Sequence, residues 1–194
     1  MRNIASFCSG LVLCLTLTAA CSAQQDKSKR PSPPAKAECN LAGGKTLTID
    51  YSSPRAKGRK IYGELPQDSA TSSASTAVPV VPFGKVWRAG ANEATTFVAD
   101  IDLNVGGTTV PAGNYTIFTI PNADKWQLVI SKKTGEWGTA YPGQGEDLAR
   151  IDMKVSQLPS PVENFTISLV KSGAGCTLQI DWETTRASVS VSKK

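Results

Sequence analysis

Residues 163–183 read ENFTISLVKSGAGCTLQIDWE, and this stretch decides the fold. On each side of a central turn, every second position is apolar: Phe165, Ile167 and Leu169 come before the turn, and Leu178, Ile180 and Trp182 come after it. This alternation places apolar side chains on one face of a half-buried strand. Because Ser172-Gly173-Ala174-Gly175 is a turn signal, the stretch predicts two consecutive strands.

The same alternation, with turn signals between its runs, continues through most of the chain. We expect strands at 45–51, 59–62, 84–88, 95–103, 108–110, 114–120, 125–131, 149–156, 163–170, 176–183 and 186–192. Many short strands separated by turns are typical of an antiparallel β-sandwich, of which the jelly roll is one form. The sequence therefore predicts an all-β fold with one β-sandwich domain at 39–194, and places Trp126 and Trp182 in its core. A flexible, Ser/Ala/Thr-rich insertion is expected at 64–81.

The first 38 residues predict export. Arg2 precedes an apolar, small-residue-rich run at 4–20, which is typical of a bacterial signal peptide. Because Ala19-Ala20 stands directly before Cys21, this site is similar to a lipobox. We therefore expect a signal peptide at 1–20 and a lipid anchor on Cys21. Such an anchor holds the protein to a membrane of the cell envelope. Cleavage after Ala23, which would give a soluble secreted or periplasmic protein, is the alternative. The polar, proline-rich residues 22–38 predict a disordered tether.

The cysteines predict a disulfide. Only Cys39 and Cys176 remain in the expected domain, and a pair of cysteines in an exported protein favours a disulfide between them. A redox-active pair is the alternative, although the Cys-x-x-Cys spacing is absent. The chain contains no histidine, which excludes Ser-His-Asp and Cys-His catalysis and every metal site that needs histidine. We therefore expect neither a metal nor another cofactor.

The charge of the domain is close to balanced. The chain has 21 basic and 16 acidic residues, of which five and two, respectively, precede Cys39, so 16 basic and 14 acidic residues remain and give the domain a net charge of +2. Such a small excess does not indicate nucleic-acid binding.

Two polar blocks supply the candidate site, and they read YSSPRAKGRK at 51–60 and VWRAGANEATT at 86–96. If they lie side by side, the three arginines Arg55, Arg59 and Arg88 surround Asn92 and Glu93. Guanidinium groups bind anions through forked hydrogen bonds. The leading hypothesis is a non-catalytic module that binds a small anionic or carbohydrate ligand, or an envelope protein. A structural ion-pair network in a purely structural envelope protein is the alternative.

A hydrolase is a further alternative. Asp100 and Asp102 share a face of the predicted strand 95–103 and could act as acid and base. Ser52 or Ser53 could pair with Lys57, although neither a nucleophile elbow nor an oxyanion hole is recognisable.

The Gly-rich loop 134–147 holds two aromatic residues, Trp137 and Tyr141. Their rings either stack on a ligand or anchor the loop to the sandwich, and anchoring is the favoured interpretation.

At these blocks the sequence resembles a bacterial exported family, domain of unknown function 2911. The resemblance spans residues 46–192 and is carried by SPR at 53–55, GR at 58–59, IYG at 61–63, PFGKVWRAGANEATT at 82–96, PAGNY at 111–115, FTIP at 118–121, EWG at 136–138 and LQIDWE at 178–183. It implies export and adds no reaction. It directs attention to eight candidate site residues: Arg55, Lys57, Arg59, Trp87, Arg88, Asn92, Glu93 and Thr95. Residues 64–81 depart from the family pattern.

Overall fold

The structure is a computed structural model that describes residues 26–66 and 78–194. The expected signal peptide at 1–20, Cys21 and most of the expected insertion at 64–81 lie outside the described residues.

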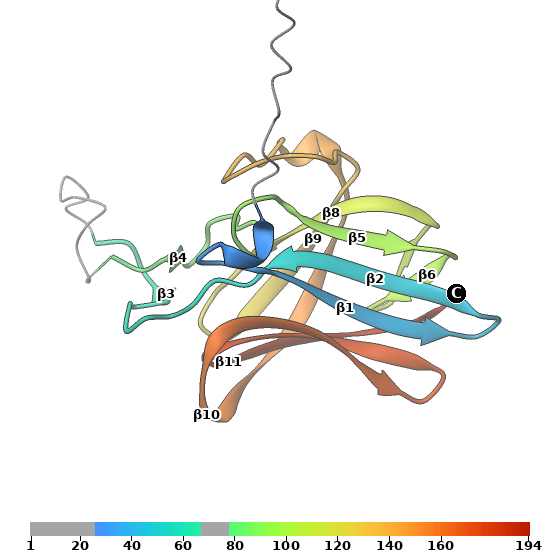
Figure 1. The fold of residues 1–194 in the computed structure, drawn as a ribbon. Coiled ribbons are helices and arrows are strands. Elements are labelled where there is room, and N and C mark those ends of the chain that lie inside the picture. The colour runs from blue at the N-terminus through green and yellow to red at the C-terminus, as the bar shows by residue number, and fades with distance from the viewer. Residues whose placement is uncertain (1–25, 67–77) are drawn as a thin grey trace, which may run out of the picture.

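Nine strands form one antiparallel sheet in the order β1-β2-β5-β8-β9-β10-β11-β6-β7 (Figure 1). These strands are β1 (Pro34–Leu41), β2 (Lys45–Ser52), β5 (Thr95–Ala99), β6 (Leu103–Val105), β7 (Thr108–Val110), β8 (Gly113–Ile120), β9 (Lys125–Ser131), β10 (Asp147–Ser172) and β11 (Gly175–Lys193). A separate parallel pair is formed by β3 (Tyr62–Gly63) and β4 (Val81–Pro82). The helical elements in the described part are two short 3₁₀ turns, η1 (Lys27–Lys29) and η2 (Gln144–Glu146). The all-β prediction is confirmed.

The sheet folds over on itself because β10 and β11 are long and bent. β10 pairs with β9 through its first residues and with β11 through the rest, and its register with β11 shifts between Gln157 and Thr166. Such bulges bend a strand and increase its twist. The sequence Pro159-Ser160-Pro161, which is typical of a turn, lies inside this bend, and the predicted strands 149–156 and 163–170 are parts of the single strand β10.

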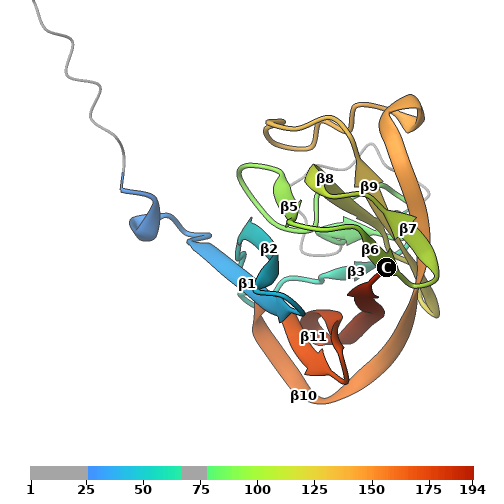
Figure 2. The ribbon, with the colours of Figure 1, turned by 90° about the vertical axis from the view of Figure 1, so that its right-hand side faces the viewer.

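The bend brings the residues after β2 against the second half of β10 (Figure 2). Phe165 N donates to Pro54 O at 2.9 Å, and Ala56 N donates to Glu163 O at 2.8 Å. The two halves of the folded sheet thus enclose one core, which is the predicted sandwich arrangement. The same contacts position the first of the two polar blocks.

Aromatic side chains fill the centre of the core. Trp126 and Trp182 are fully buried, as predicted. Trp87 stacks on Trp182 with ring centroids 5.9 Å apart, and Phe165 meets Trp87 edge-to-face at 5.0 Å. Aromatic pairs in such geometries stabilise a core beyond the area that they bury. The cluster therefore gives Trp87 a structural role in addition to any role at the surface.

Cys39 in β1 and Cys176 in β11 form the predicted disulfide, with their Cα atoms 6.5 Å apart. β1 is an edge strand of the hydrogen-bonded sheet, so the bridge ties this edge to the opposite layer. A disulfide of this kind indicates an oxidising compartment outside the cytoplasm. In the part of the chain that the structure describes, no helix has the length and apolar character needed to cross a membrane.

The domain begins before Cys39. Pro34–Glu38, which the sequence analysis assigned to a disordered tether, belong to β1, and Ala37 is buried opposite Ile49 of β2. Before Leu41 the apolar face of β1 consists of small residues, and its outer face carries Lys36 and Glu38. This composition resembles a linker, and it explains why the strand was missed.

The predicted strand 84–88 is wrong. Within it, Trp87 alone forms a β-bridge, exchanging two hydrogen bonds of 2.8 Å with Thr119. Gly84, with φ at 69°, turns the chain before Trp87. The apolar residues of this segment therefore reflect the burial of Trp87 rather than a strand.

The predicted strand 59–62 is shortened to β3, because Lys57 and Gly58 turn the chain there with φ values of 49° and 67°. Its partner β4 lies at the end of the segment predicted as a flexible insertion. The predicted strand 95–103 also divides, since β5 ends at Ala99 and β6 begins at Leu103.

Candidate functional site

The first polar block forms a tight turn after β2. Lys57 N donates to the side chain of Glu163 at 2.9 Å, which fixes the turn to β10. The guanidinium of Arg59 folds back over the turn, where its Nε donates to Ala56 O at 3.1 Å and its Nη2 donates to Arg55 O. The turn thereby carries three basic side chains, those of Arg55, Lys57 and Arg59.

The second polar block lies beside the end of β2, because Ala91 N donates to Ser52 O at 3.1 Å. Its backbone is irregular, with left-handed conformations at Ala89 (φ 51°) and Asn92 (φ 57°). The fully buried hydroxyl of Thr95 donates to Ala89 O at 2.8 Å and holds this loop in place. The two blocks are neighbours, and Thr95 acts inside the protein rather than at its surface.

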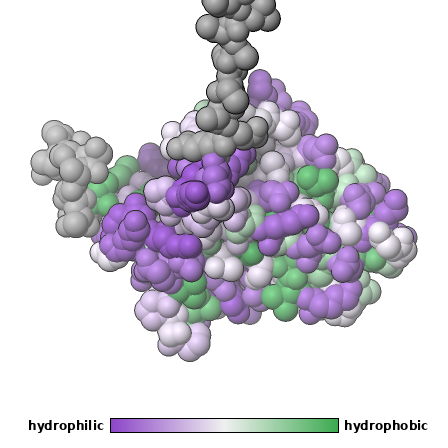
Figure 3. Space-filling model, viewed as in Figure 1, coloured by the Kyte–Doolittle hydropathy of each residue, from purple (hydrophilic) through white to green (hydrophobic). Residues whose placement is uncertain are grey.

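Between the blocks lie two adjoining pockets, which together we name the basic groove. The outer pocket, of about 330 Å³, is lined by Pro31, Ser32, Arg55, Lys57 and Arg59. The inner pocket, of about 260 Å³, is lined by Ser32, Pro54, Arg59, Val80, Trp87, Arg88, Gly90, Ala91, Thr139 and Trp182. Ser32 and Arg59 border both pockets, which are therefore neighbours. Figure 3 shows hydrophilic residues gathered beside β3 and toward the N-terminal segment.

The groove carries an excess of positive charge. Among the ion pairs of the described residues, none involves Arg55, Lys57, Arg59 or Arg88. Arg88 is half-buried, and its Nε donates to Gly90 O at 3.2 Å. Burial lowers the pKa of Arg88, because removal from water disfavours the charged guanidinium. An anion beside Arg88 would offset that cost.

Glu93 does not lie among these arginines, which corrects the expected arrangement. Its carboxylate accepts from Arg30 Nη1 at 2.8 and 3.1 Å and pairs with Lys27 Nζ at 3.1 Å. Asn92 Nδ2 donates to Ser32 O at 3.0 Å. Asn92 and Glu93 therefore hold the segment 26–32, which we name the N-terminal clasp and which supplies the outer wall of the groove.

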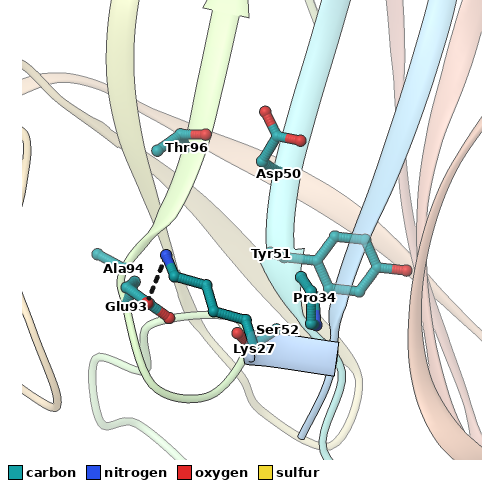
Figure 4. Close-up of a pocket in the computed structure, with 8 residues that line it drawn as sticks. All are labelled: Lys27, Pro34, Asp50, Tyr51, Ser52, Glu93, Ala94 and Thr96. Atoms are coloured by element: carbon teal, nitrogen blue, oxygen red, sulfur yellow. Dashed lines mark ion pairs between the residues drawn. The ribbon is translucent and has the colours of Figure 1, made fainter. Parts of the chain in front are cut away.

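The clasp also borders a third pocket, of about 250 Å³, beside the ends of β2 and β5. Figure 4 shows Lys27 reaching Glu93 at one end of it, with Asp50 and Thr96 at the other. Burial raises the pKa of Glu93, but hydrogen bonds from Arg30 and Lys27 outweigh this effect and hold it at about 2. Glu93 thus stays ionised and paired at neutral pH.

The two aromatic residues of the loop 134–147 have different surroundings. The Tyr141 ring packs edge-to-face on Phe118 with centroids 5.2 Å apart, and its hydroxyl lies 2.8 Å from the Asp147 carboxylate. Tyr141 is therefore the anchor that was predicted. Trp137 is 60% exposed and lies under the guanidinium of Arg30, which is 5.9 Å from the ring centroid, so it contacts the clasp.

The residues proposed for hydrolysis are engaged elsewhere. The Ser53 hydroxyl donates to Phe165 O at 2.7 Å, while the Lys57 side chain is exposed. Asp100 accepts from Thr46, and Asp102 accepts from Ala112 N. Both aspartates follow the end of β5, so they do not share a strand face as predicted.

The expected family is confirmed by comparison with protein families. A family model described as a protein of unknown function, DUF2911, matches residues 32–191. The chain belongs to the DUF2911 family. The matched residues include all four cations of the basic groove and begin at Ser32, whereas Lys27 and Arg30 of the clasp precede them. Searches of curated proteins and of solved structures returned no match to this DUF2911 chain.

Sequence reasoning missed the clasp residues Lys27, Arg30 and Ser32. They stand in a polar, proline-rich segment whose composition is that of a linker. Their partners Asn92 and Glu93 were identified as site residues, but the sequence gives no sign that they contact a segment about 60 residues earlier.

Proposed function

We propose that this DUF2911 protein is a non-catalytic binding module of the bacterial cell envelope that takes a small anionic ligand in the basic groove. One observation carries the proposal: Arg55, Lys57, Arg59 and Arg88 converge on one groove from two separate segments, and within the described residues none of their side chains forms an ion pair. Like charges brought together repel each other, so an arrangement that served only stability would contain acidic partners.

The chemistry of the groove suits an anion with several oxygen acceptors. Three of its cations are guanidinium groups, which present planar, forked donors to carboxylates and phosphates. Glu93 and Asn92 stand apart from these cations and fix the clasp instead. The groove therefore presents donors and positive charge, while the carboxylate of Glu93 is paired within the clasp and that of Glu163 accepts from the backbone of Lys57.

The disulfide supports a place outside the cytoplasm. The expected signal peptide at 1–20 would direct export, and the expected lipid anchor at Cys21 would hold the module at a membrane surface. Because Cys21 precedes Asp26 by five residues, such an anchor would keep the clasp within about 20 Å of the membrane.

A thermal-unfolding screen of the purified protein tests the proposal. Inorganic phosphate, sulfate and citrate are compared with glucose and N-acetylglucosamine, in the parent and in an Arg55→Gln/Arg59→Gln variant. A ligand at 100 times its dissociation constant stabilises the folded state by about 2.7 kcal/mol, which gives a clear shift of the melting temperature. We expect anions to stabilise the parent and not the double variant.

Lys154→Gln is the matched control, because Lys154 is an exposed cation on β10 away from the groove. It should retain the full anion-dependent shift. Equal shifts in the parent and the double variant, or shifts with the sugars alone, would contradict the proposal.

A further inference from the structure

The two ends of the basic groove differ in chemistry. The outer pocket is open and presents the cations Arg55, Lys57 and Arg59. The inner pocket adds one cation, Arg88, and is bordered by apolar residues, of which Val80 is partly exposed and Pro54, Trp87, Ala91 and Trp182 are buried. A ligand that fills both pockets therefore meets the cations of the outer pocket and, in the inner pocket, both Arg88 and apolar side chains.

Arg88 retains free donors at the inner end. Its Nε donates to Gly90 O at 3.2 Å, and this hydrogen bond fixes the plane of the guanidinium. For its two Nη groups, no hydrogen bond or ion pair is formed within residues 26–66 and 78–194. Gly138 approaches the same guanidinium from the loop 134–147, and a methyl group at this position would lie 3.8 Å from Nη1. A half-buried guanidinium held in one plane is suited to a carboxylate.

An inorganic anion would use only part of this groove. It could neutralise the outer cations, but it would leave the apolar wall and the Arg88 donors without a partner. Burying apolar ligand surface against that wall adds to affinity in proportion to the area removed from water. The body of the best ligand is therefore apolar.

We propose, on the basis of the proposed function, that the natural ligand is an elongated organic dianion. One carboxylate pairs with Arg88 in the inner pocket, an apolar chain lies along Val80 and Trp87, and a second carboxylate or phosphate lies among Arg55, Lys57 and Arg59. Ser32 and Arg59 flank the middle of the ligand, where the two pockets meet.

Isothermal titration of the purified protein with ligands of graded length tests this inference. The dicarboxylates succinate, adipate and azelate are compared with inorganic phosphate and with nonanoate, which matches azelate in length but has one charge. We expect affinity to increase with chain length, and the best dicarboxylate to bind at least tenfold more tightly than both phosphate and nonanoate.

Variants at Arg88 locate the inner carboxylate. Arg88→Gln should weaken the best dicarboxylate at least tenfold and weaken phosphate by a smaller factor, because phosphate still meets Arg55, Lys57 and Arg59 in the outer pocket. The retained phosphate binding then also shows that the variant is folded. Arg88→Lys keeps the charge but loses the paired guanidinium donors, and it should give an intermediate affinity for the dicarboxylate.

The possible failures are distinguishable. If phosphate binds and no dicarboxylate binds more tightly than phosphate or nonanoate, the inference is overturned and the proposed function stands. If Arg88→Gln leaves dicarboxylate affinity unchanged, the inner carboxylate is not at Arg88 and the inference is again overturned. If none of these anions binds, both the inference and the proposed function are wrong.

Discussion

The guanidinium of Arg30 lies against both carboxylate oxygens of Glu93, with Nη1 2.8 Å from Oε1 and 3.1 Å from Oε2. Two residues later, Ser32 forms the shared wall of both pockets of the basic groove. The Arg30–Glu93 pair, together with the hydrogen bond from Asn92 to Ser32 O, therefore holds that wall in place. Glu93, which the sequence placed in the anion site itself, instead fixes the N-terminal clasp that forms the outer wall of the basic groove.

Removing the Arg30–Glu93 pair should weaken the fold only modestly. Because the side chain of Glu93 is 36% exposed, solvent screens the pair, and we expect a coupling of about 0.5–1 kcal/mol. A double-mutant cycle of Arg30→Gln and Glu93→Gln, measured by denaturant unfolding, gives this value. Additive effects of the two substitutions would show that the pair does not hold the clasp.

The depressed pKa of Glu93 predicts a specific pH dependence. Its folded pKa of about 2 is below its ordinary value of 4.5, so its stabilising contribution is present above pH 4.5 and is lost as pH falls toward 2. The free energy of unfolding should therefore fall more steeply in the parent than in Glu93→Gln over this range. Parallel profiles of the two proteins would contradict the assignment.

The disulfide should contribute more than any other local feature. It links residues 137 positions apart, and in the chain-entropy description a loop of this length stabilises by up to about 5 kcal/mol. A Cys39→Ser/Cys176→Ser variant should lose about 2–5 kcal/mol in urea unfolding. If the variant had the same urea midpoint as the parent, β1 would be held by its other contacts alone.

Thr95 is predicted to stabilise the loop of the second polar block. Thr95→Val removes the hydroxyl that donates to Ala89 O, and leaves a buried carbonyl without this partner at a cost of about 1–3 kcal/mol. Thr95→Ser keeps the hydroxyl and should recover part of this loss. If the valine and serine variants have equal effects on the melting temperature, the hydrogen bond contributes nothing and Thr95 stabilises the loop by packing alone.

The strands that the sequence predicted well are those with long, uninterrupted alternation. Residues around Trp126, Phe165 and Leu178 form β9, β10 and β11 with their apolar side chains buried. Alternation reports which face of a strand is buried, so it succeeds wherever one face meets the core. It does not report a bend, and the joining of two predicted strands into β10 was therefore missed.

The candidate site could be predicted only where its residues are clustered in the sequence. The basic residues Arg55, Arg59 and Arg88 were grouped from their positions in two blocks, and the structure places them along one groove. The partners of Glu93 could not be found in this way, because Lys27 and Arg30 are distant in sequence and stand in a linker-like composition. Long-range ion pairs depend on the fold, and a local pattern does not encode them.

The most direct test of the basic groove is a nuclear magnetic resonance titration of the arginine Nε–Hε signals with inorganic phosphate. Arg150 and Arg186 are internal controls, because each is paired with an aspartate, at 2.8 and 2.6 Å respectively. If the groove binds anions, the signals of Arg55 and Arg59 should shift to saturation while those of the two controls stay in place. Equal, unsaturated shifts of all four arginines would contradict the central claim.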